Sequence, residues 1–415
     1  MPRITSIERT WLDLPFKEVP ARNMIRENPH WSIVELCTVT LDSGHTGVGE
    51  TLPFYTWGAV TDEAVERARG ANPAEIMWDD GLGAGLQQAC FDAVGKLVET
   101  PLWALLGARA RDRAHVGWWA IDMPAADWIL ECEEAQRQGY TSFKSKARPW
   151  FDVEDQVAQL CEAVPAHFRI DLDFNDFALD PSVARRLCKS LERWPQIAVW
   201  ESPIVQEDVA GNRELRQQLD VPIAQHAGRP QLATQLTQEM CDVFVLEGGA
   251  KNAIHCGEIC AEFNRPFWLQ LVGTDITATM ALHVAAVQSH ARWPAIACNH
   301  MYREQLIEET ITVVNGLAEI PDRPGLGVTV KQDVVERYRI DPIEIPYPPP
   351  GLLLRLEWPT GAAYHFSHAR QLWDEFQGGR LPAFIPGVNL VRVPDDGSSA
   401  WSDLHARARK GPVHD

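Results

Sequence analysis

The stretch Phe168-Arg-Ile-Asp-Leu-Asp-Phe174 decides the fold of this chain, because it is a short apolar strand that carries carboxylates at its end. A similar strand precedes it at Ser142-Phe-Lys-Ser-Lys146, and another follows it at Ile197-Ala-Val-Trp-Glu201. The segments between them, near 153–163 and 181–193, have the apolar spacing of amphipathic helices. Strands that alternate with helices in this way predict a parallel sheet with right-handed crossovers.

The alternation continues beyond residue 201. Further strands are predicted at Val221-Pro-Ile-Ala224, Val243-Phe-Val-Leu246, Phe267-Trp-Leu-Gln-Leu271 and Ala295-Ile-Ala-Cys298. Seven or eight such units within about 200 residues favour a closed (β/α) barrel over an open sheet. We therefore expect an α/β protein built on a TIM barrel.

Composition excludes several classes of protein. The chain has 415 residues, with 38 Lys and Arg against 57 Asp and Glu, so its net charge is −19. General electrostatics therefore disfavours nucleic acid and anionic membranes as partners. The sequence contains no apolar run long enough for a transmembrane helix. Its start lacks the apolar core of a signal peptide and its nine cysteines form no CxxC pair, so we expect a cytoplasmic protein with reduced thiols.

Two lysines stand at the end of the first quoted strand. Lys144 and Lys146 are two residues apart, so their side chains point to the same face of the strand. Repulsion between two such ammonium groups lowers the pKa of at least one, which makes it a candidate base near neutral pH. The alternative is a solvated edge strand that carries two surface lysines.

Carboxylates stand at the ends of the next two strands. Asp171 and Asp173 share one face of their strand, and Glu201 ends the following strand. Several buried carboxylates need a cation, because each unpaired buried charge costs several kcal/mol. Oxygen ligands on consecutive strands suit a hard divalent ion, Mg²⁺ before Zn²⁺.

The series Lys-x-Lys, Asp-x-Asn and Glu at successive strand ends resembles the enolase superfamily, in particular its mandelate racemase and muconate lactonizing branch. The segments at 44–50, 101–107 and 320–327 also resemble this family. The resemblance implies an α+β capping domain that closes over a modified (β/α) TIM barrel. It divides the chain into a capping part at 1–118, a barrel at 119–330, and a C-terminal segment at 331–415 that packs back on the capping domain.

The resemblance also implies a reaction. Members of the family abstract the proton alpha to a carboxylate and form an enediolate that Mg²⁺ holds. By resemblance, Asp173 and Glu201 take the first two metal-ligand positions, with Asp171 the rival for the first and Asn175 completing the Asp-x-Asn motif beside the substrate. Lys146 takes the position of the base. Lys144 tunes that base and binds the substrate carboxylate.

Three positions depart from the family pattern. The third metal position carries His226 rather than an acid, and this imidazole either binds the metal or lies near the substrate while water completes the shell. The Asp–His pair of the racemases is replaced by Glu247 and Gln270. Because glutamine cannot transfer a proton, a two-base mechanism through that pair is disfavoured. His300, Glu247 and His226 are the remaining candidates for a second acid.

Further candidates for substrate binding lie around the expected barrel mouth. Arg26, His30 and Trp31 stand where the family has a mobile capping loop, and Arg148 follows the two lysines. The predicted function is dehydration of a sugar acid or hydroxy acid. The alternatives are racemization or epimerization of the same class of small carboxylate, or a homologue that only binds. The family also implies a homo-oligomer.

Overall fold

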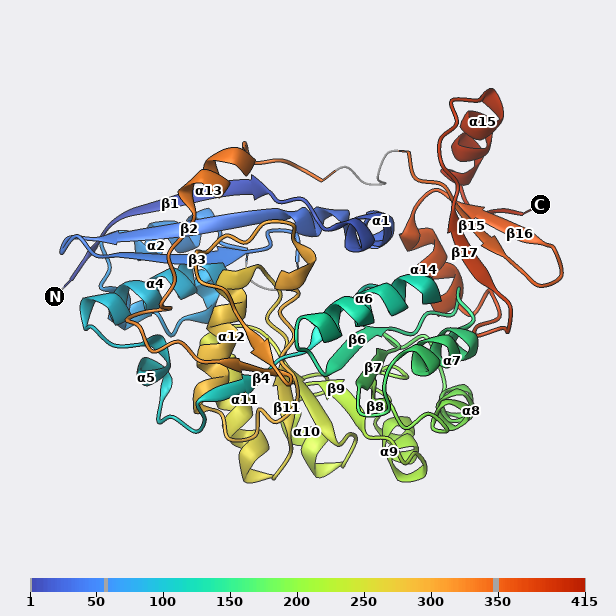
Figure 1. Cartoon of the computed structure of the whole chain (residues 1–415), viewed down its shortest axis with the longest axis horizontal. Coiled ribbons are helices and arrows are strands. Elements are labelled where there is room, and N and C mark those ends of the chain that lie inside the picture. The colour runs from blue at the N-terminus through green and yellow to red at the C-terminus, as the bar shows by residue number, and fades with distance from the viewer. Residues whose placement is uncertain (1, 56–58, 346–350, 415) are drawn as a thin grey trace.

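The computed structural model describes residues 2–55, 59–345 and 351–414 (Figure 1). Residues 346–350, which form most of a proline cluster in the sequence, lie outside these ranges. Within the described residues, no helix is both long and apolar enough to span a bilayer.

A seven-stranded parallel sheet forms the centre of the molecule, in the order β11-β10-β9-β8-β7-β6-β5. Its strands are β5 (Trp118–Trp119), β6 (Ser142–Lys146), β7 (Arg169–Asp173), β8 (Ile197–Glu201), β9 (Ile223–His226), β10 (Val243–Leu246) and β11 (Phe267–Leu269). The eighth predicted strand is reduced to two isolated bridges, at Ala295 and Ile296, which close the barrel. The amide of Ile296 donates to the carbonyl of Leu269 at 2.8 Å, while the carbonyl of Ala295 accepts from the amide of Gly117 at 2.9 Å.

Helices cover the outside of this barrel: α6 (Ala125–Arg137), α7 (Val153–Ala163), α8 (Pro181–Leu191), α9 (Val209–Gln218), α10 (Leu232–Thr237), α11 (Ala250–Glu262) and α12 (Asp275–Val287). Local chemistry sets where they begin. In α8, Asp180 accepts from the amides of Ser182 and Val183, and Pro181 stands at the first position, where its missing N–H is harmless. The closed parallel sheet and the helices around it confirm the predicted modified (β/α) TIM barrel.

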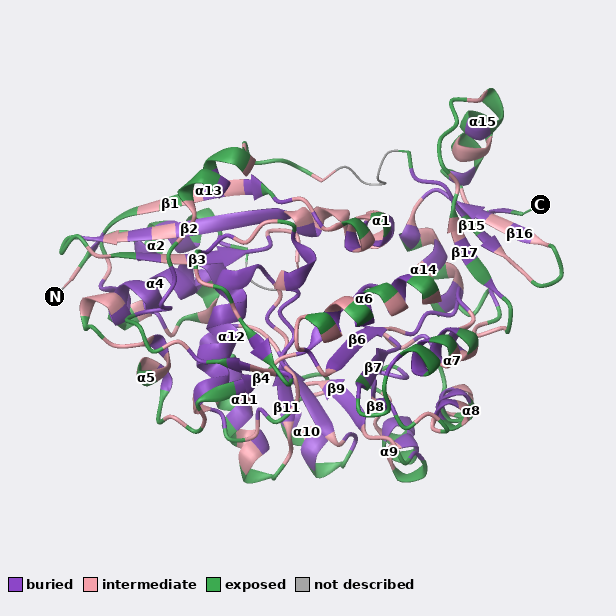
Figure 2. Cartoon of the chain, viewed as in Figure 1, coloured by how far each residue is buried: buried purple, intermediate pink, exposed green. Residues whose placement is uncertain are grey.

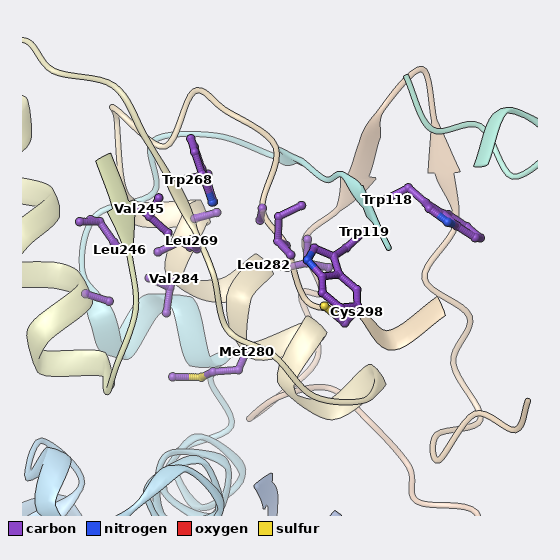
Figure 3. Close-up of a cluster of buried hydrophobic side chains, with 14 of the residues drawn as sticks. Trp118, Trp119, Val245, Leu246, Trp268, Leu269, Met280, Leu282, Val284 and Cys298 are labelled. Carbon is purple, nitrogen blue, oxygen red and sulfur yellow. The ribbon is translucent and has the colours of Figure 1, made fainter. Parts of the chain in front are cut away.

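Helix α12 is buried on all sides, because the barrel and the N-terminal region both pack against it. Its residues from Asp275 to Ala286 are all buried (Figure 2). Figure 3 shows Met280, Leu282 and Val284 of α12 in one buried cluster with side chains of β10 and β11.

The N-terminal region is an antiparallel sheet in the order β14-β1-β2-β3, made of β1 (Ile4–Asp13), β2 (Ile33–Leu41), β3 (Thr46–Thr51) and the late strand β14 (Arg339–Ile340). The helices of this region are α1 (Glu18–Glu27), η1 (Pro29–Ser32), α2 (Asp62–Ala68), α3 (Pro73–Ile76), η2 (Asp80–Leu82), α4 (Ala84–Leu97) and α5 (Leu102–Leu106). Helix α4 lies so close to β3 that a Cβ at Gly47 would stand 2.0 Å from the carbonyl oxygen of Ala89. This α+β region is the expected capping domain.

Carboxylates of the capping domain hold it on the barrel. Glu50, at the end of β3, accepts from the amides of Thr274 and Thr277 at the start of α12. Asp80 accepts from the amides of Lys251 and Asn252 at the start of α11. Both contacts satisfy amides that a helix leaves unpaired at its N-terminus, where negative charge is favourable.

The chain after the barrel contacts the capping domain in its first part and one side of the barrel in its last part. A small sheet of β4 (Arg113–His115), β12 (Val313–Val314) and β13 (Leu317–Glu319), with the turn η3 (Asn299–Met301), precedes α13 (Gln332–Tyr338). Helix α13 contacts β1, and β14 pairs with β1, so this part does return to the capping domain. The boundaries at residues 118 and 330 stay predictions.

Residues 352–414, which we call the C-terminal sheet module, form a separate structure at one side of the barrel (Figure 1). Its sheet has the order β17-β15-β16-β18. Its elements are β15 (Leu354–Glu357), β16 (Ala363–Phe366), α14 (Ala369–Gln377), β17 (Asn389–Arg392), α15 (Ser399–Ala408) and β18 (Val413–His414). Its core includes Trp150, Phe151 and Phe177 from the loops that follow β6 and β7.

Candidate active site

The two lysines of β6 face carboxylates on the neighbouring strands. Strand register sets Lys146 beside Asp173 and Asp173 beside Glu201, so the ends of β6, β7 and β8 are level. Lys146 forms an ion pair with Asp173, and Lys144 forms one with Glu201. The Lys146 side chain is 13% exposed, whereas that of Lys144 is 1% exposed. The structure thus excludes a solvated edge strand.

The environment of Lys144 raises the pKa of its amine. Burial disfavours the charged form, but the carboxylates of Glu201 and Asp173 outweigh it and raise the pKa of Lys144 above its ordinary value. Its amine also donates to Gln270 and lies 5.0 Å from the centre of the Trp268 ring. Lys144 is therefore a fixed positive charge at the site.

His226 lies between two carboxylates. Its Nε2 is 3.1 Å from Oε1 of Glu201, and its Nδ1 is 3.4 Å from Oε2 of Glu247. Burial opposes protonation, yet the hydrogen bonds to these two carboxylates raise the pKa of His226 to about 9. In turn, the hydrogen bond from His226 lowers the pKa of Glu247. At neutral pH the ring is an imidazolium that donates to both neighbours.

Glu201 is fully buried but remains ionised. Burial would raise its pKa, but the charge of Lys144 and the hydrogen bond from His226 hold that pKa well below the ordinary value. The neighbouring Gln225 points elsewhere, because its amide donates to Asn212 and its oxygen faces Ser202. His226, not Gln225, therefore completes the site at the end of β9.

Whether a divalent cation fits this site depends on the groups that the candidate ligand residues already contact. Asp173 and Glu201 are oxygen ligands of the kind that Mg²⁺ accepts, at adjacent strand ends. In the described part of the chain, no three His, Cys, Asp or Glu side chains form a cluster ready to hold a metal. Lysine amines occupy the two carboxylates, and the Nε2 of His226 is engaged by Glu201. The two carboxylates fit a cation, and His226 would join them as a ligand only after losing the proton that it shares with Glu201.

Two further carboxylates lie at the site. Burial raises the pKa of Asp171, on the face of β7 that carries Asp173, to about 7. Asp176, which the sequence analysis missed, follows Asn175 in a turn where both residues have positive φ. Burial and the charge of Asp173 raise its pKa to about 7, and His226 is close enough to lower it. Its Oδ1 is buried without a hydrogen-bond partner among the described residues. The sequence signal was a second acid directly after the Asp-x-Asn motif.

The other predicted residues are distributed unevenly around the site. Asn175 belongs to it, since its backbone N–H donates to Oδ1 of Asp173 at 2.8 Å. Gln270 and Glu247 belong to it through Lys144 and His226. His300 is placed differently from the expectation, because its ring stacks on Trp118 at 3.9 Å and its Nε2 contacts the backbone of Trp119. Burial lowers the pKa of His300 to about 3, so these contacts disfavour it as the second acid.

The capping-loop candidates contact other buried groups rather than the lysines. Arg26 pairs with Asp122 at 2.6 Å, and Trp31 stacks on Trp119 at 5.3 Å. His30 meets the edge of Phe54 at 6.2 Å. Arg148 is buried against aromatic rings, so it holds the wall of the site instead of lining its opening.

Comparison with known families and curated proteins gives consistent matches. A family model described as "Enolase C-terminal domain-like" matches residues 128–334. The D-xylonate dehydratase of Haloferax volcanii is 24% identical, with 77% of this chain and 87% of that protein covered. The arabinonate dehydratase of Saccharolobus solfataricus is 25% identical over 72% of this chain and 89% of its own length. The o-succinylbenzoate synthase of Bacillus subtilis is 24% identical, with 61% of this chain and 70% of that protein covered.

Solved structures show the same fold. The muconate cycloisomerase of Pseudomonas fluorescens superposes with a TM-score of 0.68 at 20% identity, covering 81% of this chain and 99% of its own. The N-succinyl Arg/Lys racemase of Bacillus cereus gives a TM-score of 0.68 at 18% identity, covering 82% and 98%. These structures therefore share the barrel and its cap, and about a fifth of this chain lies outside the shared part.

Proposed function

Because this chain is an enzyme of the enolase superfamily, in the mandelate racemase and muconate lactonizing branch, we propose that it abstracts the proton alpha to a carboxylate and dehydrates a sugar acid or hydroxy acid. The observation that carries this proposal is the arrangement of Lys144 and Lys146 on β6 against Asp173 and Glu201. Sugar-acid dehydratases among the relatives support the choice of substrate class.

We assign the base to Lys146. Its amine is the less buried of the two and reaches the mouth of the barrel, where Asp173 now holds it. When a bound substrate separates Lys146 from Asp173, the ammonium first releases its proton to solvent, and the neutral amine then accepts the alpha proton. Lys144, whose pKa is raised, stays charged beside Gln270 and stabilises the negative charge that develops on the substrate carboxylate.

We assign the second proton transfer to His226. As the C–O bond breaks at the neighbouring carbon, the imidazolium gives its proton to the departing hydroxyl group, which leaves as water. Glu247 and Glu201 hold the ring on either side and keep it protonated until then. Gln270 cannot supply this proton, so the residues favour elimination over racemization through an Asp–His pair.

Members of this family generally use Mg²⁺, and in this chain Asp173 and Glu201 are the residues that would hold it. A divalent cation there would supply electrostatic stabilisation of the enediolate. His226 would then lie beside the substrate, which is the second of the two interpretations that the sequence left open.

Product analysis tests the proposed reaction. The purified protein is incubated with Mg²⁺ and a panel of aldonic acids, and 2-keto products are trapped as semicarbazones and measured by absorbance. We expect a keto product from at least one acid with the wild-type protein and none with Lys146→Ala. Conversion of an acid into its epimer without keto product would replace dehydration by epimerization.

A further inference from the structure

The C-terminal sheet module lies beyond the part of the chain that the family model matches, which ends at residue 334. It is nevertheless joined to the barrel mouth by a shared core. Trp150, Phe151 and Phe177 come from the loops after β6 and β7, and they pack with Leu372 and Phe376 of α14 in one buried cluster. These loops are direct continuations of the strands that carry Lys146 and Asp173.

Arg148 is the central residue of this contact. It stands two residues after Lys146, and it is 2% exposed. Its guanidinium lies 4.7 Å from the ring centre of Trp373, 5.2 Å from that of Phe177 and 5.6 Å from that of Trp150. The module thus supplies, through Trp373, one of the aromatic faces that enclose this charge.

A buried network of charges ties the same point to the capping domain. Trp373 donates its indole N–H to Glu27 of α1, and Glu27 lies 3.8 Å from Arg148. Asp122 accepts from the indole of Trp150 at 2.7 Å, and burial together with the charge of Asp122 raises the pKa of Glu27 to about 7. Helix α14, helix α1 and the loops after β5 and β6 therefore meet at one set of paired charges.

The module also reaches the end of β7. Phe384 packs against Phe174, the residue that follows Asp173, with ring centres 5.9 Å apart. The amide of Gly387 donates to Asp152 at 2.7 Å in the loop after β6. The amide of Ala147 in turn donates to the carbonyl of Asp173, so the two strand ends are locked to each other.

We propose that the C-terminal sheet module is a working part of the catalytic centre, in which Trp373 acts through Arg148 as a positioning residue for Lys146. This inference rests on the proposed function only for its effect on turnover. Removing the aromatic face and the indole donor frees Arg148 and Glu27, which loosens the end of β6 and the ion pair between Lys146 and Asp173.

The test compares two tryptophans of the same module. Trp373→Leu removes the contact with Arg148, whereas Trp401→Leu is the matched control, because Trp401 packs inside the module against Leu353 and donates to the backbone of Val393. The first readout needs no substrate: the amines are labelled briefly with acetic anhydride and Lys146 is quantified by tandem mass spectrometry against exposed Lys189. We expect labelling of Lys146 to rise about tenfold in Trp373→Leu, within the range of coupling between contacting residues, and to stay at the wild-type level in Trp401→Leu.

The second readout is turnover of an acid that the wild-type protein accepts. We expect kcat to fall about a hundredfold in Trp373→Leu with KM little changed, because a displaced base weakens the transition state and not substrate binding. Trp373→Phe keeps an aromatic face over Arg148, and we expect it to restore most of the difference. If Trp373→Leu does not fold, Arg148→Lys serves instead, since it keeps the charge and loses the planar stacking group.

The two readouts separate the two proposals. Equal labelling of Lys146 in Trp373→Leu, Trp401→Leu and wild type would overturn the positioning role, whatever the activity. Raised labelling in Trp373→Leu alone would support the positioning role even in a protein that dehydrates none of the acids tested.

Discussion

Replacing His226 by glutamine removes the imidazolium that lies between Glu201 and Glu247, and the loss should depend on pH. The pKa of His226 rises from 6.5 to about 9 in the folded protein. A difference of this size corresponds to about 3 kcal/mol of stabilisation of the folded state. Because the folded pKa is the higher one, the contribution is complete below pH 6.5 and is lost as the pH rises through about 9.

Urea unfolding of the wild type and of His226→Gln, at pH 6 and pH 10 with EDTA present, measures this contribution. The free energy of unfolding of the wild type should exceed that of the variant at pH 6, and the difference should shrink by about 3 kcal/mol at pH 10. His167→Gln is the control, because it makes the same substitution at an exposed histidine. A pH-independent difference for His226→Gln would refute the claim that the ring is an imidazolium held by two carboxylates.

Three other substitutions give distinct expectations. Glu201→Gln leaves Lys144 buried without its anion, so we expect loss of substrate turnover and a lower melting temperature, measured by activity assay and calorimetry. Glu50→Ala leaves amides at the start of α12 unpaired and should lower the free energy of unfolding by about 1–3 kcal/mol in denaturant titrations. His300→Phe keeps a ring over Trp118 and should retain the wild-type dependence of turnover on pH. If the fall in turnover at acidic or alkaline pH disappeared in this variant, His300 would again be a candidate proton donor.

Much of the barrel could be predicted from the sequence because its strands are short apolar runs with clear helical spacing between them. The predicted strands at 142–146 and 197–201 agree with β6 and β8 residue for residue, and β7 differs by one residue at each end from the predicted 168–174. The predicted strand at 295–298 is reduced to two isolated bridges, and Cys298 has left-handed backbone geometry at its end. The local sequence pattern identified this strand, but the closure of the barrel determined how many of its residues pair.

The C-terminal sheet module shows where local patterns are insufficient. Helix α14 (Ala369–Gln377) buries Ala369, Leu372 and Phe376 on one face, a spacing that the local sequence itself carries. The four short strands were not predicted, because their pairing depends on contacts between β15, β16, β17 and β18 that are distant in sequence. The contact of Arg148 with Trp373 is equally non-local, so the sequence offered Arg148 only as a lining residue.

In the site, residues on strands were easier to predict than their partners. Alternation along β6 and β7 places Lys144, Lys146, Asp171 and Asp173 on one face, and this follows from the sequence alone. The raised pKa of Lys144 did not follow from the sequence, since it depends on the carboxylate of Glu201, which the fold brings beside it. Charge balance in a buried cluster depends on all its members, and their positions come from separate strands.

The central claim is that Lys146 removes the proton alpha to a carboxylate. Its most direct test is proton NMR in D₂O with Mg²⁺ and a panel of sugar acids, with Lys146→Ala and the surface variant Lys189→Ala measured beside the wild type. We expect the alpha-proton signal to be lost with the wild type and with Lys189→Ala, and to stay unchanged with Lys146→Ala. Exchange that continues at the wild-type rate in Lys146→Ala would contradict the claim.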